Sequence, residues 1–310
     1  MKTVLIVLFC LIGTALFSQN LTIQEKLGYP KNTKLLIIHA DDIGVSHAEN
    51  AASFKALESG FVNSGSIMVP CPWFPESADY AKNNPTKDLG LHLTLTSEWK
   101  LYKWGPVRSK NEVKSLLDKQ DYLYETAKGL AQSGTASEVE SELRAQIERA
   151  KAFGIDATHF DTHMGATLLK PEFLSAYIKL GHEYRTPVLL NKEHLKLIGG
   201  YDDLAKYITD KDVVVDNIYM ALPNDYKAGM TQYYEQVINN LQPGLHCLLI
   251  HTCFDNDEMK AVTMGYSIYH GTWRQADYDF FTSKKCGDLL KKNNIQLVTW
   301  REIRDKIVRK

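Results

Sequence analysis

The chain has 310 residues, with 36 basic and 37 acidic residues, a net charge of −1 and 44% hydrophobic residues. This length is sufficient for one large core and fits a single α/β barrel as well as two small domains. Because the charge is balanced and no run of Lys and Arg is present, the composition argues against nucleic acid as a partner.

Residues 1–19 have the pattern of a secretory signal peptide. Lys2 supplies a positive charge, an apolar run extends from Val4 to Phe17, and a short polar stretch follows. The alternative is a membrane anchor, but the run is shorter than the roughly 20 apolar residues that a spanning helix needs. We therefore expect residues 20–310 to form a mature, exported protein in the periplasm or outside the cell, without a stable membrane span.

Four cysteines lie in the expected mature chain: Cys71, Cys247, Cys253 and Cys286. An even number of cysteines in an oxidising compartment permits disulfides. A chain of this length does not need them for stability, and the spacings are not those of a zinc knuckle. We expect free, buried thiols.

Strand-like and helix-like segments alternate along the chain. Strands are expected over residues 35–39, 64–69, 89–96, 157–164, 188–190, 213–215, 244–251 and 295–300. One helix is expected over 48–60. Apolar residues from Val139 to Ala150 indicate another, with a capping box at Ser137 and Glu140 and with Gly154 after its end. The alternation predicts one α/β domain, a distorted (β/α) barrel with its site at the C-terminal ends of the strands.

The first expected strand runs directly into residues 39–44, which read His-Ala-Asp-Asp-Ile-Gly. Burying two adjacent carboxylates is costly unless a cation or another partner pairs with them. Asp41 and Asp42 therefore indicate a bound cation or a reaction at this strand end. An Asx turn followed by a helix N-cap is the structural alternative.

Histidines and acids recur at the ends of later strands. Alternation places His92 on the polar face of its strand and puts His159, Asp161 and His163 together on one face of another, while His251 ends an apolar run. Barrel enzymes keep their active sites at these strand ends, so we expect the side chains to share one pocket. Each histidine taken alone could instead be a hydrogen-bonded structural residue.

Imidazoles and carboxylates in one pocket suit a catalytic divalent metal. Two imidazoles and one carboxylate leave open positions on the ion, which then acidifies water and polarises a carbonyl oxygen. A neighbouring carboxylate that does not bind the metal can accept the proton of the water, and a separate histidine can protonate a leaving amine. This inventory fits hydrolysis of an amide bond.

These residues resemble the YdjC-like carbohydrate deacetylases, which are relatives in mechanism of the polysaccharide deacetylases. The resemblance extends from about Lys34 to Arg304. Besides 39–44, it lies in Gly-Leu-His at 90–92, Thr-His-Phe-Asp-Thr-His at 158–163 and Trp-Arg-Gln-Ala-Asp at 273–277. The chain departs from the family pattern in Met-Gly-Ala-Thr at 164–167 and Thr-Cys at 252–253. These departures leave the shape of the pocket and the substrate open.

The resemblance implies a role for each residue of the centre. Asp42, His92 and His163 would hold one divalent metal ion. Asp41 would be the general base, and His251 would be the general acid.

The resemblance also implies residues that support this centre. His159 and Asp161 would orient His163 or the substrate. Arg274 and Asp277 would line or brace the pocket, with a surface ion pair as the alternative.

The implied function is metal-dependent removal of acetyl groups from N-acetylated sugars or oligosaccharides. Zinc is the first choice of metal, and magnesium or manganese are alternatives. Two rival interpretations stay open. One is a metal-dependent phosphoesterase or a ferrous oxygenase on the same barrel, and the other is a non-catalytic carbohydrate-binding protein. The sequence leaves open the sugar, its chain length, the acyl group and the oligomeric state.

Residues 97–135 are the least regular part of the chain. We expect them to form an excursion at the mouth of the barrel that could act as a lid. Four aromatic side chains in or near this segment could stack on sugar rings, although core packing is the commoner role for each: Trp73, Trp99, Tyr102 and Trp104.

Overall fold

The structure is a computed structural model that describes residues 21–59, 61–192 and 208–310. The expected signal peptide lies outside the described residues, as does Gly60, the expected end of a helix. Within the described ranges, no helix is both long enough and apolar enough to cross a membrane.

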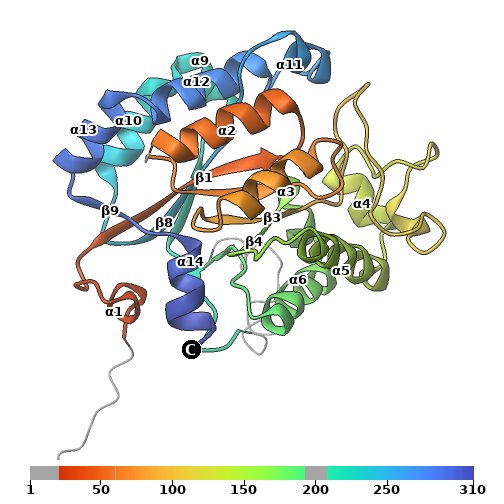
Figure 1. The fold of residues 1–310 in the computed structure, drawn as a ribbon, viewed down its shortest axis with the longest axis horizontal. Coiled ribbons are helices and arrows are strands. Elements are labelled where there is room, and N and C mark those ends of the chain that lie inside the picture. Colours follow the sequence, from red (N-terminus) through yellow and green to blue (C-terminus); the bar gives the residue numbers. More distant parts are fainter. Residues whose placement is uncertain (1–20, 60, 193–207) are drawn as a thin grey trace, which may run out of the picture.

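Parallel strands form a curled central sheet in the order β4-β3-β2-β1-β8-β7, with β9 also paired to β1 (Figure 1). Their bounds are β1 Lys34–Ile43, β2 Ser64–Ile67, β3 Leu89–Leu93, β4 Phe160–Thr162, β7 Asn217–Met220, β8 Gly244–Ile250 and β9 Ile295–Leu297. The short strands β5 Leu190–Asn191 and β6 Val214–Val215 pair with each other. A bridge between Phe160 and Val188 connects β4 to the segment before β5. The strands therefore curl into a half-barrel.

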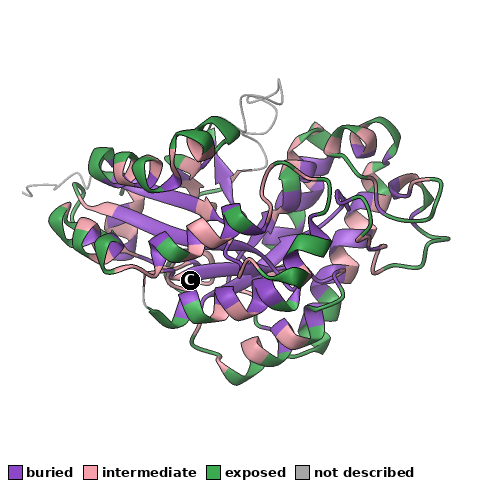
Figure 2. Ribbon diagram, turned by 90° about the horizontal axis from the view of Figure 1, so that it is seen from above, coloured by how far each residue is buried: buried purple, intermediate pink, exposed green. Residues whose placement is uncertain are grey.

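Helices surround this sheet and expose their outer faces, while the strands are buried (Figure 2). Their bounds are α1 Ile23–Leu27, α2 His47–Ser59, α3 Phe74–Asn83, α4 Ala127–Ser133, α5 Ala136–Ala152, α6 Pro171–Tyr184, α9 Pro223–Ala228, α10 Met230–Asn240, α11 Asp257–Val262, α12 Gly271–Phe281, α13 Lys284–Lys292 and α14 Trp300–Ile303. Three short helical turns complete the described chain: η1 Lys114–Leu116, η2 His163–Leu168 and η3 Arg304–Val308.

Alternation along β1 divides the apolar core between the two faces of the sheet. Leu36 belongs to the large cluster beneath the surrounding helices. Leu35 and Ile37 belong to a second cluster on the inner face, which α14 and η3 help to close. His39 and Asp41 continue the inner row, because side chains two residues apart in a strand point to the same side. His39 and Asp41, near the C-terminal end of β1, therefore lie directly beyond the inner apolar cluster on the same face of the sheet.

The expected single-domain, distorted (β/α) barrel is confirmed, but several element boundaries differ. β1 continues to Ile43, so Asp41 and Asp42 lie within the strand rather than after it. β3 and β4 are shorter than expected, and β7, which the sequence did not indicate, pairs with β8. Its sequence, Asn-Ile-Tyr-Met, is too short to show a clear alternating pattern.

The start of α5 also differs from the expectation. Thr135 is the N-cap, and its side chain accepts a hydrogen bond from the backbone N–H of Glu138 at 3.4 Å. The expected capping box at Ser137 and Glu140 is therefore wrong, because both residues already lie inside the helix. Gly154 follows the end of α5 with φ = 89°, a left-handed conformation that glycine adopts without strain.

The four cysteines are buried and free, as expected. The irregular segment 97–135 packs on α5, where Glu142 accepts hydrogen bonds from the backbone N–H groups of Val107 (2.8 Å) and Arg108 (2.9 Å). Trp99 and Trp104 are buried in it. The segment forms a packed wall beside the strand ends, which is consistent with an excursion at the mouth of the barrel.

Gly90 on β3 provides a test of how tightly the strands are packed. A Cβ atom at this position would lie 2.4 Å from the ring of His159 and 2.5 Å from its carbonyl oxygen. We expect Gly90→Ala to lower the free energy of unfolding by about 1–3 kcal/mol through overpacking. Gly105→Ala is the matched control, because its Cβ would meet no atom closer than 3.7 Å. Equal denaturation midpoints for the two variants in urea would contradict this account.

Candidate active site

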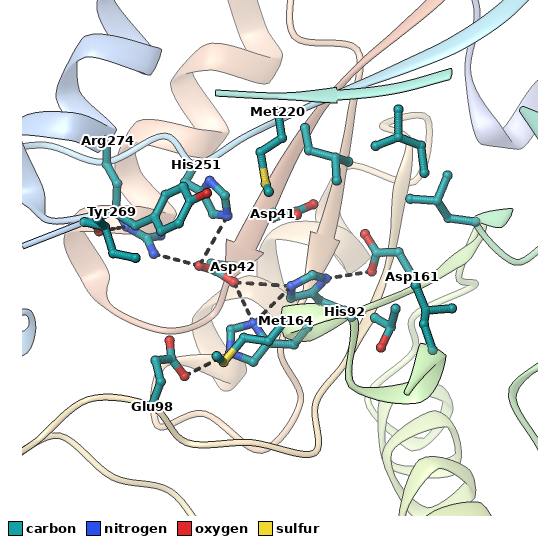
Figure 3. Close-up of a pocket in the computed structure, with 18 of the residues that line it drawn as sticks. Asp41, Asp42, His92, Glu98, Asp161, Met164, Met220, His251, Tyr269 and Arg274 are labelled. Carbon is teal, nitrogen blue, oxygen red and sulfur yellow. Dashed lines mark hydrogen bonds and ion pairs between the residues drawn. The ribbon is translucent and has the colours of Figure 1, made fainter. Parts of the chain in front are cut away.

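Two adjacent carboxylates reach the same cavity because the backbone of β1 is irregular at its end. Regular alternation would send Asp41 and Asp42 to opposite faces. Asp42 instead has φ = 62°, and the pairing of β1 with β2 shifts register between Ala40 and Ile43. Aspartate tolerates this left-handed conformation better than most residues. Both side chains consequently line one cavity (Figure 3).

The alternative interpretation of these aspartates as a helix N-cap is wrong. The helix that follows is α2, which begins at His47. The side-chain oxygen of Ser46 accepts a hydrogen bond from the backbone N–H of Glu49 at 3.0 Å, so serine caps this helix. The aspartates remain available to the cavity.

Three side chains from distant parts of the sequence converge on one point. Oδ1 of Asp42 lies 3.3 Å from Nε2 of His92 and 3.2 Å from Nδ1 of His163. The two ring nitrogens are 3.2 Å apart. Ligand atoms that surround a tetrahedral zinc ion at its usual bond lengths are roughly 3.3 Å apart. The triangle therefore has the size that such an ion requires.

Hydrogen bonds to carboxylates orient both histidines toward this point. His92 and Asp161 are paired residues of β3 and β4, and Nδ1 of His92 donates to Oδ1 of Asp161 at 2.8 Å. Nε2 of His163 donates to Oε2 of Glu98 at 2.9 Å. When each ring is neutral, its proton is on the outer nitrogen, and both inner nitrogens then present lone pairs to the centre.

The electrostatics of the triangle favour a cation. Oδ1 of Asp42 is buried and has no hydrogen-bond partner. Burial opposes a charge on His163, but the carboxylates of Glu98 and Asp42 raise its pKa to about 9. A positive charge is therefore favoured beside Asp42, either as a second proton on His163 or as a bound cation that replaces this proton. These buried residues could bind a metal ion, and Asp42, His92 and His163 form such a group.

Arg274 holds the second oxygen of Asp42. Its guanidinium donates to Oδ2 of Asp42 at 2.8 Å and to Oε1 of Glu49 at 3.0 Å. Burial opposes the charge on Asp42, but Arg274 and the two histidines overcome it and hold the pKa of Asp42 well below its usual range. Arg274 is only 2% exposed, so the alternative of a surface ion pair with Asp277 is wrong.

Asp41 lies beside the triangle and contacts a different histidine. Its Oδ1 is 3.0 Å from Nε2 of His39, which also bonds Oδ2 of Asp161 at 2.8 Å. Burial opposes a charge on His39, but the hydrogen bonds to Asp161 and Asp41 raise its pKa to about 9. Asp161 thus bridges His39 and His92, and it does not contact His163 as one expectation had it.

His251 follows β8 on the opposite side of Asp42. Its Nε2 is 4.0 Å from Oδ2 of Asp42, and its ring packs against Tyr269. Burial lowers the pKa of His251 to about 4, and the nearby Arg274 acts in the same direction. Its backbone N–H donates to Asp277 at 2.9 Å. Asp277 therefore positions His251 through the main chain rather than through the ring.

His159 lies apart from the triangle, although it was expected to orient His163 or the substrate. Its ring packs against Trp300 with centroids 5.3 Å apart, and its Nδ1 bonds the hydroxyl of Thr158 at 2.9 Å. Its ring lies beside His39, with centroids 4.8 Å apart, and one of its ring nitrogens lies within 4.8 Å of ligand atoms of His39 and Asp161. Its role in this structure is packing beneath the site.

The converging groups line a cavity of about 630 Å³. Sequence reasoning assigned no role to Glu98, Glu49 and Tyr269, nor to His39, although His39 stands in the motif at 39–44. Glu98 and Tyr269 lie in irregular segments, and Glu49 lies on α2 without a distinctive spacing. Of the four aromatic residues proposed to stack on sugars, Trp99 lines the cavity. The others are engaged elsewhere: Tyr102 bonds the carbonyl oxygen of Val45, Trp104 bonds that of Thr96, and Trp73 packs on His47.

The fold and the convergent side chains define a single-domain (β/α) barrel with a candidate metal centre at its strand ends. Residues 35–292 match the family described as YdjC-like protein, and the chain belongs to this family. A carbohydrate deacetylase of Thermus thermophilus is 32% identical over 91% of this chain and 97% of its own length. A chitooligosaccharide deacetylase of Yersinia enterocolitica is 29% identical over 54% of this chain and 63% of its own length.

A solved structure from Enterococcus faecalis, named for cellobiose-phosphate cleavage, has the same fold. Its TM-score is 0.72 at 22% identity, over 87% of this chain and 99% of that one. At this level of identity the likeness extends to the fold alone.

The buried carboxyl of Asp277 makes the free energy of unfolding depend on pH. Burial raises the pKa of its carboxyl to about 7, against hydrogen bonds from Tyr234 and His251 that lower it. A carboxyl whose pKa is higher in the folded state loses stability as the pH rises, here from about 4 to about 7. We expect Asp277→Asn to remove this loss, so that its free energy of unfolding gains a few kcal/mol on the wild type across that range.

The control for this comparison is Asp279→Asn, which changes an exposed aspartate on the same helix α12. Urea unfolding at several pH values between 4 and 8 measures the effect. A constant difference between wild type and Asp277→Asn at all pH values would contradict it.

Proposed function

We propose that this protein removes acetyl groups from N-acetylated sugars or oligosaccharides. The single observation that carries the proposal is the meeting of Asp42, His92 and His163 within 3.2–3.3 Å of one another, with Asp41 beside them and not among them. Membership in the YdjC-like family supports it, as do relatives named carbohydrate deacetylase and chitooligosaccharide deacetylase.

Asp42, His92 and His163 would hold one divalent ion, and zinc is our first choice because imidazole and carboxylate ligands in a triangle of this size suit it. Magnesium and manganese are the alternatives. Such an ion, when bound, supplies Lewis acidity for water and for the amide carbonyl. Arg274 would keep the carboxylate of Asp42 to a single free oxygen.

Asp41 would act as the general base. It is the carboxylate next to the triangle, and its Oδ1 lies 3.0 Å from Nε2 of His39. As base it would take a proton from the attacking water.

His251 would give a proton to the departing amine. Since burial lowers its pKa to about 4, it carries no proton at neutral pH and would first take one up from water, while Asp41 would return its own proton to water after the reaction. Because a signal peptide is expected at residues 1–19, we also propose that the protein is exported, so that its substrate would be a glycan in the periplasm or outside the cell.

The two adjacent aspartates should respond differently to substitution. We expect Asp42→Ala to lose bound metal and activity together, because it removes one of three ligands. Asp41→Asn should keep the metal and lose about 10²- to 10⁴-fold in turnover, as expected for a missing general base. Metal content by mass spectrometry, with acetate release from chitin oligomers, measures both.

Asp279→Asn serves as the control variant for handling and folding. Full activity in Asp41→Asn would exclude Asp41 as the base. Full metal content in Asp42→Ala would remove Asp42 from the ligand set.

The proposed role of His251 can be tested with two kinds of substrate. Amides need a protonated leaving group, whereas activated esters need this much less. We expect His251→Ala to slow amide hydrolysis at least tenfold more than hydrolysis of an activated acetate ester. Steady-state kinetics on both substrates gives the ratio, and equal losses on the two would exclude the role of acid.

A further inference from the structure

The cavity floor beneath the catalytic residues is apolar. Leu249 lies two residues before His251, so it points to the same side and one step deeper. The strand pairings place Leu249 beside His39 of β1 and beside Met220 of β7. Ile218, two residues before Met220, lies on the same face. These aliphatic and thioether side chains line the cavity together with the catalytic groups.

This floor is the part of the inner apolar cluster that borders the cavity. Leu189 belongs to the inner apolar cluster, and Ile218 and Leu249 pack against it. All three also line the cavity. Ile218 and Leu249 are only half-buried, so the described residues leave part of their surface accessible. Apolar surface in a concave site is a place where an apolar ligand group gains free energy by displacing water.

The polar groups of the cavity lie above this floor. Arg274, Tyr269 and His251 stand on one side of Asp42, and Glu98 stands on another (Figure 3). The hydroxyl groups of a sugar need hydrogen-bond partners, which side chains such as Leu249 and Ile218 do not offer. A bound amide would therefore direct its sugar toward the polar rim and its acyl group toward the floor.

An acetyl group is too small to cover this floor. It carries one methyl group, whereas Leu168, Leu189, Ile218, Met220 and Leu249 all line the cavity. We propose that the preferred acyl group of the substrate is a straight alkyl chain longer than acetyl, held on Ile218, Met220 and Leu249. The inference rests on the proposed amide hydrolysis at the same site and replaces the acetyl group named there by a longer acyl group as the preferred one.

A series of N-acylglucosamines with acetyl, butanoyl, hexanoyl and octanoyl groups tests the proposal. Release of free amine by the metal-loaded protein gives kcat/KM for each. We expect kcat/KM to rise about fourfold for each added methylene until the floor is covered. Ile218→Phe, which fills the floor, should lower the ratio of hexanoyl to acetyl cleavage at least tenfold. Leu21→Phe makes a comparable change at an exposed position (52%) and should leave that ratio unaltered.

Binding of the product carboxylates gives a readout that does not require turnover. Calorimetric titration with acetate, butanoate and hexanoate should show affinity that increases with chain length, and Ile218→Phe should abolish the increase. Fastest cleavage of the acetyl substrate together with equal affinities would overturn the inference and leave the proposed deacetylase intact. Failure to cleave any of the amides would overturn the proposed function, and the carboxylate affinities would then decide the inference alone.

Discussion

The carboxylate of Asp42 is divided between two kinds of partner, and the geometry of the site depends on this division. Oδ2 is held by Arg274, while Oδ1 faces His92 and His163. A buried carboxylate is tolerated only when it is paired, and removing one partner of such a pair typically costs about 3–5 kcal/mol. Arg274 is in turn held by Glu49 on α2. The guanidinium of Arg274 thus neutralises Asp42 through Oδ2 and leaves Oδ1 of Asp42 free for the centre.

The second constraint is the carboxylate of Asp161 on β4, which contacts side chains from β1, β2 and β3, including the hydroxyl of Ser66 on β2. One oxygen bonds His92 on β3 and the other bonds His39 on β1, while Asp161 itself lies on β4. The same residue therefore sets the proton position of a candidate metal ligand and fixes the histidine that contacts Asp41. Rigid strands, rather than loops, supply most of the centre, which favours a preformed arrangement.

Sequence patterns predict much of this arrangement. The rest depends on the register between paired strands, which sequence patterns do not specify. Acids and imidazoles at strand ends predicted a shared pocket, and the family resemblance singled out Asp42, His92 and His163, which the structure brings together. Asp161 was expected to support His163, but the register of β3 with β4 places it beside His92 instead. No local signal specifies register between strands that are far apart in sequence. The left-handed backbone at Asp42 is likewise set by the surrounding fold, since its neighbours in the sequence read as a regular strand.

Two of the three strands that pair with the central strand β1 come from near the other end of the chain, whereas β2 follows β1 closely. β1 pairs along most of its length with β8, and near Lys34 its other edge is taken by β9. During synthesis from the N-terminus, β1 emerges long before either partner has been made. Its apolar edge then stays open to wrong pairings until the ribosome has translated nearly the whole message. A truncated form that ends before β8 would lack His251 and the strand that pairs with β1 beside His39.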